Sequence, residues 1–223
     1  MESMTEHRPH AQPNDYLPAA GRDLFLPGYD LLTRVMGMAS AYDELLEQAD
    51  LTDGWRVLEI GCGTGNVTLR AKRLQPEAEM IGLDPDPRAL ALAQRKAKGL
   101  TGIRFEQGYS QHLPFADGEF DCVLSSMMLH HLDEQTKKAT AVEALRVLRP
   151  GGSLHILDIG GRMTAADGFM ARRLLRGDHV KGNVGDAIPR LLAEAGFECN
   201  ETASRRHRFV GRLTFYRAAR PAT

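Results

Sequence analysis

Short apolar segments alternate with helical segments through the middle of the chain. Five segments of strand length follow one another, at 55–60, 79–83, 102–107, 120–125 and 153–159. Helical patterns lie between them, at 66–74, 89–98 and 134–148. Parallel strands joined by crossover helices produce this alternation, because each helix returns the chain to the start of the next strand. The pattern predicts an α/β fold with a parallel sheet between two layers of helices.

The last part of the chain has a different order of helices and strands. A helix is expected over 185–195, followed by strands over 197–203 and 209–218. Two strands separated by so short a connection can pair only antiparallel. We therefore expect a three-layer α/β/α sandwich around a mostly parallel, seven-stranded sheet that ends in a C-terminal antiparallel hairpin.

Length and composition fit one domain. The chain has 223 residues, a net charge of −1 and 43% hydrophobic residues, enough to bury a core without disulfides. We expect a loose N-terminal arm over 1–20 and a single domain over 21–223. Within it, 21–50 form a helical cover and 160–185 an insert that acts as a lid on the acceptor side. Three scattered cysteines and an N-terminus without an apolar run predict a cytoplasmic protein with no transmembrane segment.

A glycine-rich turn follows the first strand. Gly61, Gly63 and Gly65 permit positive φ angles and close approach of a ligand to the backbone. Asp84 ends the second strand, where an acid can bind ribose hydroxyls. A dinucleotide fingerprint would need glycine where Asn66 stands, and Glu59 suits a cationic ligand better than a pyrophosphate. S-adenosylmethionine fits this chemistry; an NAD(P)-dependent oxidoreductase and a turn without a ligand are the alternatives.

Motifs in a fixed order extend this pattern. VLEIGCGTG at 57–65 is followed by IGLDPD, LPFADGEFDCVLSS, LHHL and LRVLRPGGSLHILD. The chain thereby resembles the class I S-adenosylmethionine-dependent methyltransferases, in the small-molecule branch that includes the ubiquinone/menaquinone-biosynthesis C-methyltransferases. The resemblance implies a Rossmann-like fold, S-adenosyl-L-methionine as cofactor and methyl transfer to a small molecule. A catalytically silent module that binds the cofactor and regulates a partner is a further alternative.

The resemblance also implies a set of cofactor-binding residues. They are Tyr29, Glu59, Gly61, Cys62, Gly63, Gly65, Asp84, Pro85, Tyr109, Ser110 and Ser126. The glycines would lie beneath the methionine moiety and the ribose, with Glu59 toward the amino end. Asp84 would hold the ribose hydroxyls, and Pro85 would flank the adenine. Tyr109 stands where many relatives carry an acid for the adenine amino group. Tyr29 matches an aromatic residue that closes over the cofactor in relatives.

Methyl transfer is an in-line displacement, so the enzyme chiefly aligns the reactants and excludes water. A base is needed only where the acceptor must lose a proton. His131 and, after it, His130 are the candidate catalytic residues, because they follow the fourth strand and histidine titrates near neutral pH. Packing against the backbone would explain either histidine equally. Asp158 ends the fifth strand, where it either faces the site or makes a structural hydrogen bond. No His/Cys/Asp spacing resembles a metal site.

The acceptor side of the chain is apolar and basic. The insert over 160–185 combines glycines with apolar side chains, which suits a lid over a small apolar or aromatic acceptor. From residue 162 to the end, 12 Lys/Arg stand against 6 Asp/Glu. The clusters Arg172–Arg173, Arg205–Arg206 and Arg208 would serve an anionic acceptor, a lipid head group or RNA, or simply a solvated face. We expect no nucleic-acid partner and a monomer or homodimer.

Overall fold

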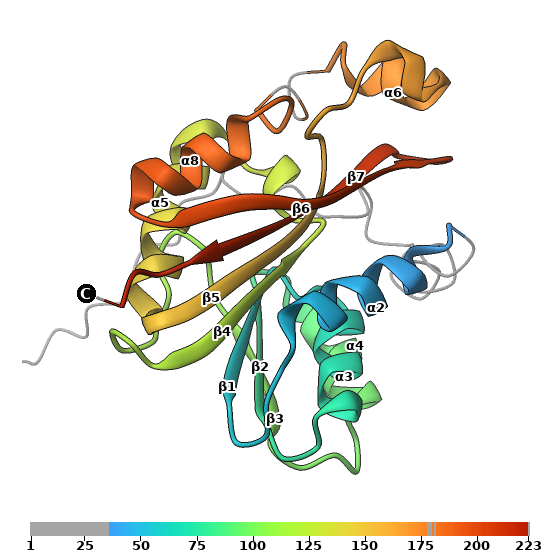
Figure 1. Ribbon diagram of the computed structural model, residues 1–223. Helices are drawn as coiled ribbons and strands as arrows, with labels where there is room; N and C mark the ends of the chain where they lie inside the picture. Colours follow the sequence, from blue (N-terminus) through green and yellow to red (C-terminus); the bar gives the residue numbers. More distant parts are fainter. Residues whose placement is uncertain (1–35, 178–179, 181, 223) are drawn as a thin grey trace, which may run out of the picture.

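The computed structural model describes residues 36–177, 180 and 182–222 (Figure 1). Seven strands form one sheet in the order β3-β2-β1-β4-β5-β7-β6. The strands are β1 (Arg56–Ile60), β2 (Glu79–Asp84), β3 (Ile103–Gln107), β4 (Phe120–Ser126), β5 (Leu148–Ile159), β6 (Glu198–His207) and β7 (Gly211–Ala219). The first five are parallel, and β7 runs antiparallel between β5 and β6. The expected Rossmann-like fold with its antiparallel hairpin is confirmed.

Helices cover both faces of the sheet. They are α2 (Met38–Ala49), α3 (Asn66–Leu74), α4 (Pro87–Lys96), α5 (Glu134–Val147), α6 (Phe169–Leu174) and α8 (Ala187–Ala195). Figure 1 shows α2, α3 and α4 on one side of the sheet and α5 and α8 on the other. Two apolar clusters correspond to these faces. Val57 packs on the side of α2 and α3, whereas its neighbour Leu58 packs toward α5 and α8, as side chains alternate along a strand.

The order of the strands positions the functional edge. β1 is flanked by β2 on one side and by β4 on the other, so the connections after β1 and β4 leave in opposite directions. In open α/β sheets, ligands bind at the carboxyl ends of the strands where the order reverses in this way. The turn after β1, the end of β2 and the segment after β4 meet at this edge.

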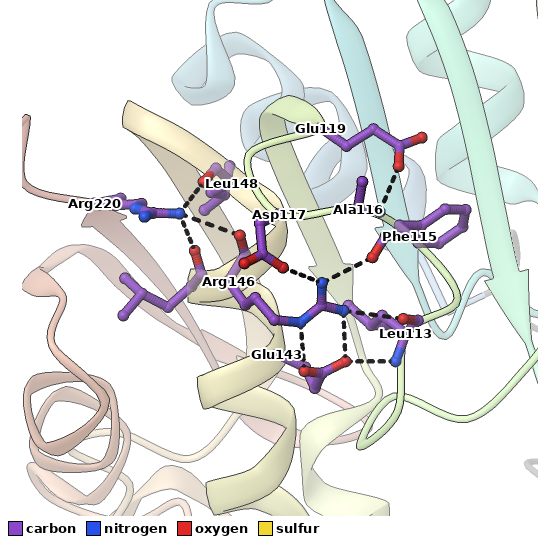
Figure 2. A network of polar contacts seen from close by, with 10 residues as sticks. Leu113, Phe115, Ala116, Asp117, Glu119, Glu143, Arg146, Leu148 and Arg220 are labelled. Carbon is purple, nitrogen blue, oxygen red and sulfur yellow. Dashed lines mark hydrogen bonds and ion pairs between the residues drawn. The ribbon is translucent and has the colours of Figure 1, made fainter.

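A polar network fixes the opposite edge, where β4 and β5 begin (Figure 2). The guanidinium of Arg146, near the end of α5, donates to the Leu113 and Phe115 carbonyls and to the Asp117 carboxylate. Glu143 accepts from Arg146 and from the Leu113 N–H. These contacts anchor the loop before β4 to the helix before β5, so this edge serves the architecture.

Three elements depart most from their expected bounds. α2 begins at Met38 because Gly37, with φ of 73°, interrupts the backbone there; residues 29–35 of the expected helix and the arm over 1–20 lie outside the described residues. β5 begins at Leu148, which was expected to end the preceding helix but pairs with Phe120 of β4. β6 continues to His207, beyond its expected end at residue 203, because its last residues pair with β7. These residues are polar, so the pattern of apolar residues does not indicate a strand there. In the part of the chain that the structure describes, no helix is long and apolar enough to cross a membrane.

Candidate active site

The chain turns from β1 into α3 over residues 61–65. Gly61, Gly63 and Gly65 all have positive φ, at 74°, 52° and 76°, the region that favours glycine. A Cβ added to Gly61 would lie 2.3 Å from Cγ of Met128, whereas one added to Gly63 would meet no atom of the described residues within 4 Å. Among these residues, the surface over Gly63 is open, and Met128 limits the space over Gly61.

Asp84 ties this turn to the end of β2. One carboxylate oxygen accepts from the Gly63 N–H at 2.8 Å, and the other accepts from the Asp86 N–H at 2.9 Å. Burial raises the pKa of Asp84, although both hydrogen bonds oppose that rise. An ionised carboxylate offers about four acceptor positions, so each oxygen keeps capacity for a further donor. This chemistry suits the two hydroxyls of a ribose.

Glu59 lies beneath the turn. It shares a face of β1 with Val57 and accepts a hydrogen bond from the Thr68 hydroxyl of α3. Burial raises its pKa to about 8, with a smaller contribution from the nearby Asp84 charge. The carboxyl therefore keeps its proton at neutral pH in the ligand-free protein, and a cationic ligand beside it would favour the ionised form.

The side chain of Cys62 points away from the open surface. It is buried, and a Cβ added to Gly82 of β2 would lie 2.9 Å from its Sγ. Burial raises the pKa of this thiol well above its ordinary value, so it stays protonated. At this position only the backbone is available to a ligand.

The structure separates two residues that were predicted together beside the adenine. Tyr109 is 44% exposed and forms an isolated bridge with His112. Ser110 is buried, and its hydroxyl contacts that of Thr140 on α5 at 2.8 Å. Tyr109 therefore has a surface to offer a ligand, while the Ser110 side chain packs against α5. Pro85 is half-buried and accepts from Gln107 at 3.1 Å, which joins the ends of β2 and β3.

The segment after β4 carries the other predicted residues. Ser126 is half-buried, and Met127 next to it has a φ of 56°. Ser125 is buried, and its hydroxyl has no hydrogen-bond partner among the described residues. This serine lines a small cavity between the sheet and α5, together with Met128 and Thr140. Tyr29, the remaining predicted residue, lies outside the described residues.

A buried histidine–carboxylate pair lies at the same edge. His130, in a short 3₁₀ turn (Leu129–His131), places Nδ1 2.6 Å from Oδ1 of Asp158. That same oxygen also accepts from the Ile159 N–H at 2.7 Å. Burial by itself raises the pKa of Asp158, but the charge and hydrogen bond of His130 outweigh it, and the net pKa is lowered. Asp158 is therefore ionised, and its carboxylate accepts a hydrogen bond from Nδ1–H of His130.

His131 is less enclosed than its neighbour. Its ring is tilted by 41° against that of His130, with the centroids 4.0 Å apart. The sequence favoured His131 as the base, whereas the geometry favours His130, because the carboxylate contacts His130. The sequence left open whether Asp158 faces the site or makes a structural bond, and only the fold brings the pair together.

A buried lysine fastens the end of the 160–185 insert, a contact that sequence reasoning missed. Lys137 of α5 donates to Oδ1 of Asn183 at 2.6 Å, and Nδ2 of Asn183 donates to the Ile159 carbonyl at 3.2 Å. Asn183 is fully buried, and burial lowers the pKa of Lys137. Gly161 pairs with Val184 beside them. Both ends of the insert are thereby fixed at the carboxyl end of β5.

These features fit S-adenosylmethionine. The backbone at Gly63 leaves room for a ligand among the described residues, the buried Asp84 carboxylate suits ribose hydroxyls, and a cation beside Glu59 would favour the ionised form of its carboxyl. A phosphate would meet two carboxyl groups instead. The residues present therefore match a sulfonium nucleoside better than a dinucleotide.

Comparisons with known proteins agree. A family model described as a methyltransferase domain matches residues 57–152. A demethylmenaquinone methyltransferase of Thermus thermophilus is 33% identical over 201 residues, covering 77% of this chain and 88% of the relative. One from Deinococcus radiodurans is 31% identical over 207 residues, covering 86% and 83%. A ubiquinone/menaquinone biosynthesis C-methyltransferase of Blochmanniella floridana is 32% identical over 137 residues, covering 58% and 53%.

Solved structures share the fold. Phosphoethanolamine N-methyltransferase 2 of Haemonchus contortus, in complex with S-adenosyl-L-methionine, has a TM-score of 0.72 at 16% identity, covering 91% of this chain and 58% of that one. The YcgJ protein of Bacillus subtilis has a TM-score of 0.67 at 17% identity, covering 82% and 98%. The sequence relatives decide against the oxidoreductase alternative. The chain belongs to the class I S-adenosylmethionine-dependent methyltransferases.

Proposed function

We propose that this enzyme methylates a ring carbon of a small, apolar aromatic acceptor of the quinone class, in its reduced hydroquinone form. The names of the relatives from Thermus thermophilus, Deinococcus radiodurans and Blochmanniella floridana motivate the acceptor class. The observation that carries the proposal is the buried contact between His130 and Asp158. A hydroquinone must lose a proton to become a strong carbon nucleophile, and this pair supplies a base.

The residues at the strand ends would hold the cofactor. Asp84 binds the ribose, the backbone at 61–65 supports the methionine part, and Tyr109 with Pro85 borders the adenine. When bound, S-adenosylmethionine would supply an electrophilic methyl group, to which the acceptor bonds in line while the electron pair of the broken carbon–sulfur bond leaves with the sulfur.

His130 would take the acceptor proton. The Asp158 carboxylate accepts a hydrogen bond from Nδ1–H of His130, so Nε2 is the ring nitrogen with a lone pair to accept a proton. Transfer of the hydroxyl proton to Nε2 leaves its electron pair on the phenolate oxygen, from which it strengthens the ortho ring carbon as a nucleophile. Once that carbon carries the methyl group, it loses its hydrogen as a proton, which restores the aromatic ring. The resulting imidazolium is stabilised by the buried carboxylate, as in other histidine–carboxylate pairs.

The insert would enclose the acceptor. Met163 is buried, and Leu174 and Leu175 pack partly buried against the same apolar cluster. Because Lys137 and Asn183 fix the end of the insert, these apolar side chains stay near the carboxyl end of β5. An apolar wall there excludes water from the reacting atoms.

Transfer to a short-chain reduced naphthoquinone tests the proposal. The purified protein, the acceptor and methyl-labelled S-adenosylmethionine are incubated, and the product is identified by mass spectrometry and NMR. We expect a new methyl group on a ring carbon and none when that carbon is already methylated. Label on an oxygen or nitrogen atom would overturn the acceptor class. Binding of S-adenosylhomocysteine without transfer to any compound in a broad acceptor screen would favour the regulatory module.

A further inference from the structure

We propose that one end of the molecule docks on an anionic membrane surface. This end, named here the basic end, consists of residues 162–177 with α6 and of the hairpin turn at 205–212. Figure 1 shows α6 beside the end of the sheet at which β6 turns into β7. Membrane docking goes beyond the proposed function, because vesicle binding can be measured without methyl transfer.

The basic end lies at the same edge of the sheet as the active site. β5 ends at Ile159, and the next residue, Gly160, donates its N–H to the Arg212 carbonyl at 3.3 Å. Because β7 runs antiparallel to β5, the start of β7 and the hairpin turn stand beside the carboxyl end of β5. A surface that contacts this end would therefore lie next to the opening of the acceptor site.

A buried carboxylate joins the two segments of the basic end. Asp167 accepts from Arg206 at 2.8 Å and from Arg212 at 2.7 Å. Its side chain is only 2% exposed, so its charge is covered by the two guanidinium groups. Ala171 of α6 packs closely on Gly211, where an added Cβ would meet its side chain at 3.0 Å. The two segments thus form one built surface.

This surface carries a large excess of positive charge. Its arginines are Arg162, Arg172, Arg173, Arg176, Arg205, Arg206, Arg208 and Arg212, and Asp167 is the single acid in the described parts of these two segments. Arg162 and Arg205 form ion pairs with acids outside the surface, Glu201 and Glu44. Arg172, Arg173 and Arg176 on and after α6 are exposed. Such a cluster attracts an anionic lipid surface.

Exposed aromatic side chains stand among these charges. Phe169, the first residue of α6, is 76% exposed, and Phe209 at the hairpin turn is 38% exposed. Aromatic rings flanked by arginines suit the boundary between head groups and acyl chains, where the ring leaves water and the cations meet phosphate. The Arg208 guanidinium lies 5.4 Å from the Phe209 ring centre and covers one face of that ring. A stacking platform for RNA bases needs free ring faces, so the observations favour a lipid surface.

Vesicle binding tests the proposal. The full chain is sedimented with vesicles of phosphatidylcholine, and with vesicles that also contain phosphatidylglycerol, at low and at high salt. We expect binding only to the anionic vesicles, with strong weakening by salt. Each basic residue near such a surface contributes about fivefold to the partition coefficient. Arg172→Ser with Arg173→Ser is therefore expected to lower it by about 25-fold, and Phe169→Ala to lower it further.

A matched double variant controls for charge alone. Arg95 and Lys98 are exposed at the end of α4, on the β3 side of the sheet, so Arg95→Ser with Lys98→Ser is expected to bind vesicles as the parent does. Equal binding by both double variants, no binding to anionic vesicles at low salt, or tighter binding to single-stranded RNA would each overturn the proposal. The Kd for S-adenosylhomocysteine should be equal in all variants, because none of the changed residues is among those proposed to bind the cofactor. Vesicle binding and the proposed function can thus fail separately.

Discussion

Nδ1 of His130 lies 2.6 Å from Oδ1 of Asp158, and both side chains are buried beside the end of β5. The Asp158 oxygen that contacts the ring also accepts from the Ile159 backbone. The backbone of β5 therefore sets the direction of the carboxylate, and the carboxylate sets which ring nitrogen carries the proton. An arrangement of this kind prepares a base before the acceptor arrives.

Removal of the proposed base, His130, should slow methyl transfer without loss of cofactor binding. His130→Asn is expected to lower kcat by about 100-fold or more, the usual contribution of a general base. Asp158→Asn keeps the shape of the pair but removes its charge, so we expect an intermediate loss. Both are measured by single-turnover kinetics, with S-adenosylhomocysteine affinity as the control. If His131→Asn proves the more damaging change, His131 is the base instead.

Asp84 should govern cofactor affinity. Asp84→Ala removes a carboxylate that we expect to hold two ribose hydroxyls, and hydrogen bonds to charged groups contribute about 1.5–3 kcal/mol each. The Kd for S-adenosylhomocysteine, measured by calorimetry, is expected to rise by about 100-fold or more. Asp53→Ala, at an exposed position before β1, is the matched control and should leave the Kd unchanged. An unchanged Kd in Asp84→Ala would contradict the assigned ribose contact.

Glu59 should make stability depend on pH. Its pKa is about 8 in the folded protein against an ordinary 4.5, so the folded state holds one more proton than the unfolded state between these values. The free energy of unfolding should therefore fall by about 1.4 kcal/mol for each pH unit as the pH rises through this window. Glu59→Gln removes this contribution, and Glu77→Gln at an exposed position retains it. Urea denaturation of the three proteins across the window measures the difference, and parallel curves for the parent and Glu59→Gln would refute the assignment.

Tyr109 is 44% exposed, so its ring has a surface on which an adenine can stack. Tyr109→Phe should bind S-adenosylhomocysteine as the parent does, while Tyr109→Ala should bind about 2- to 10-fold more weakly, the range of an aromatic pair. Calorimetry on both variants separates the ring from its hydroxyl. Equal losses would mean that the hydroxyl contacts the adenine, and no loss in either would remove Tyr109 from the site.

An element can be predicted from the sequence when neighbouring residues determine it, and not when contacts with distant segments do. The turn at 61–65 and the end of β2 are local patterns, since glycine spacing and strand length set them, and they were predicted residue by residue. Contacts between distant segments were not. Nothing in the sequence near His130 shows that Asp158, 28 positions later, comes within hydrogen-bond distance, because the pairing of β4 with β5 brings them together. The polar end of β6 escaped prediction because its partner strand, and not its own periodicity, makes it a strand.

Asn183 depends on such distant contacts most of all, so its removal should be costly. Its amide receives the Lys137 ammonium and donates to the Ile159 carbonyl from a fully buried position. Asn183→Ala leaves a buried charge and a carbonyl without their partner, and we expect the free energy of unfolding to fall by about 2–4 kcal/mol. Asn200→Ala, at an exposed position of β6, is the matched control and should change it by less than about 0.5 kcal/mol. Because Asn183 also fixes the insert, trypsin should cleave Asn183→Ala faster after Arg172, Arg173 or Arg176 than it cleaves the control. Equal cleavage rates in a destabilised variant would mean that the insert is held mainly by Asp167 and its two arginines.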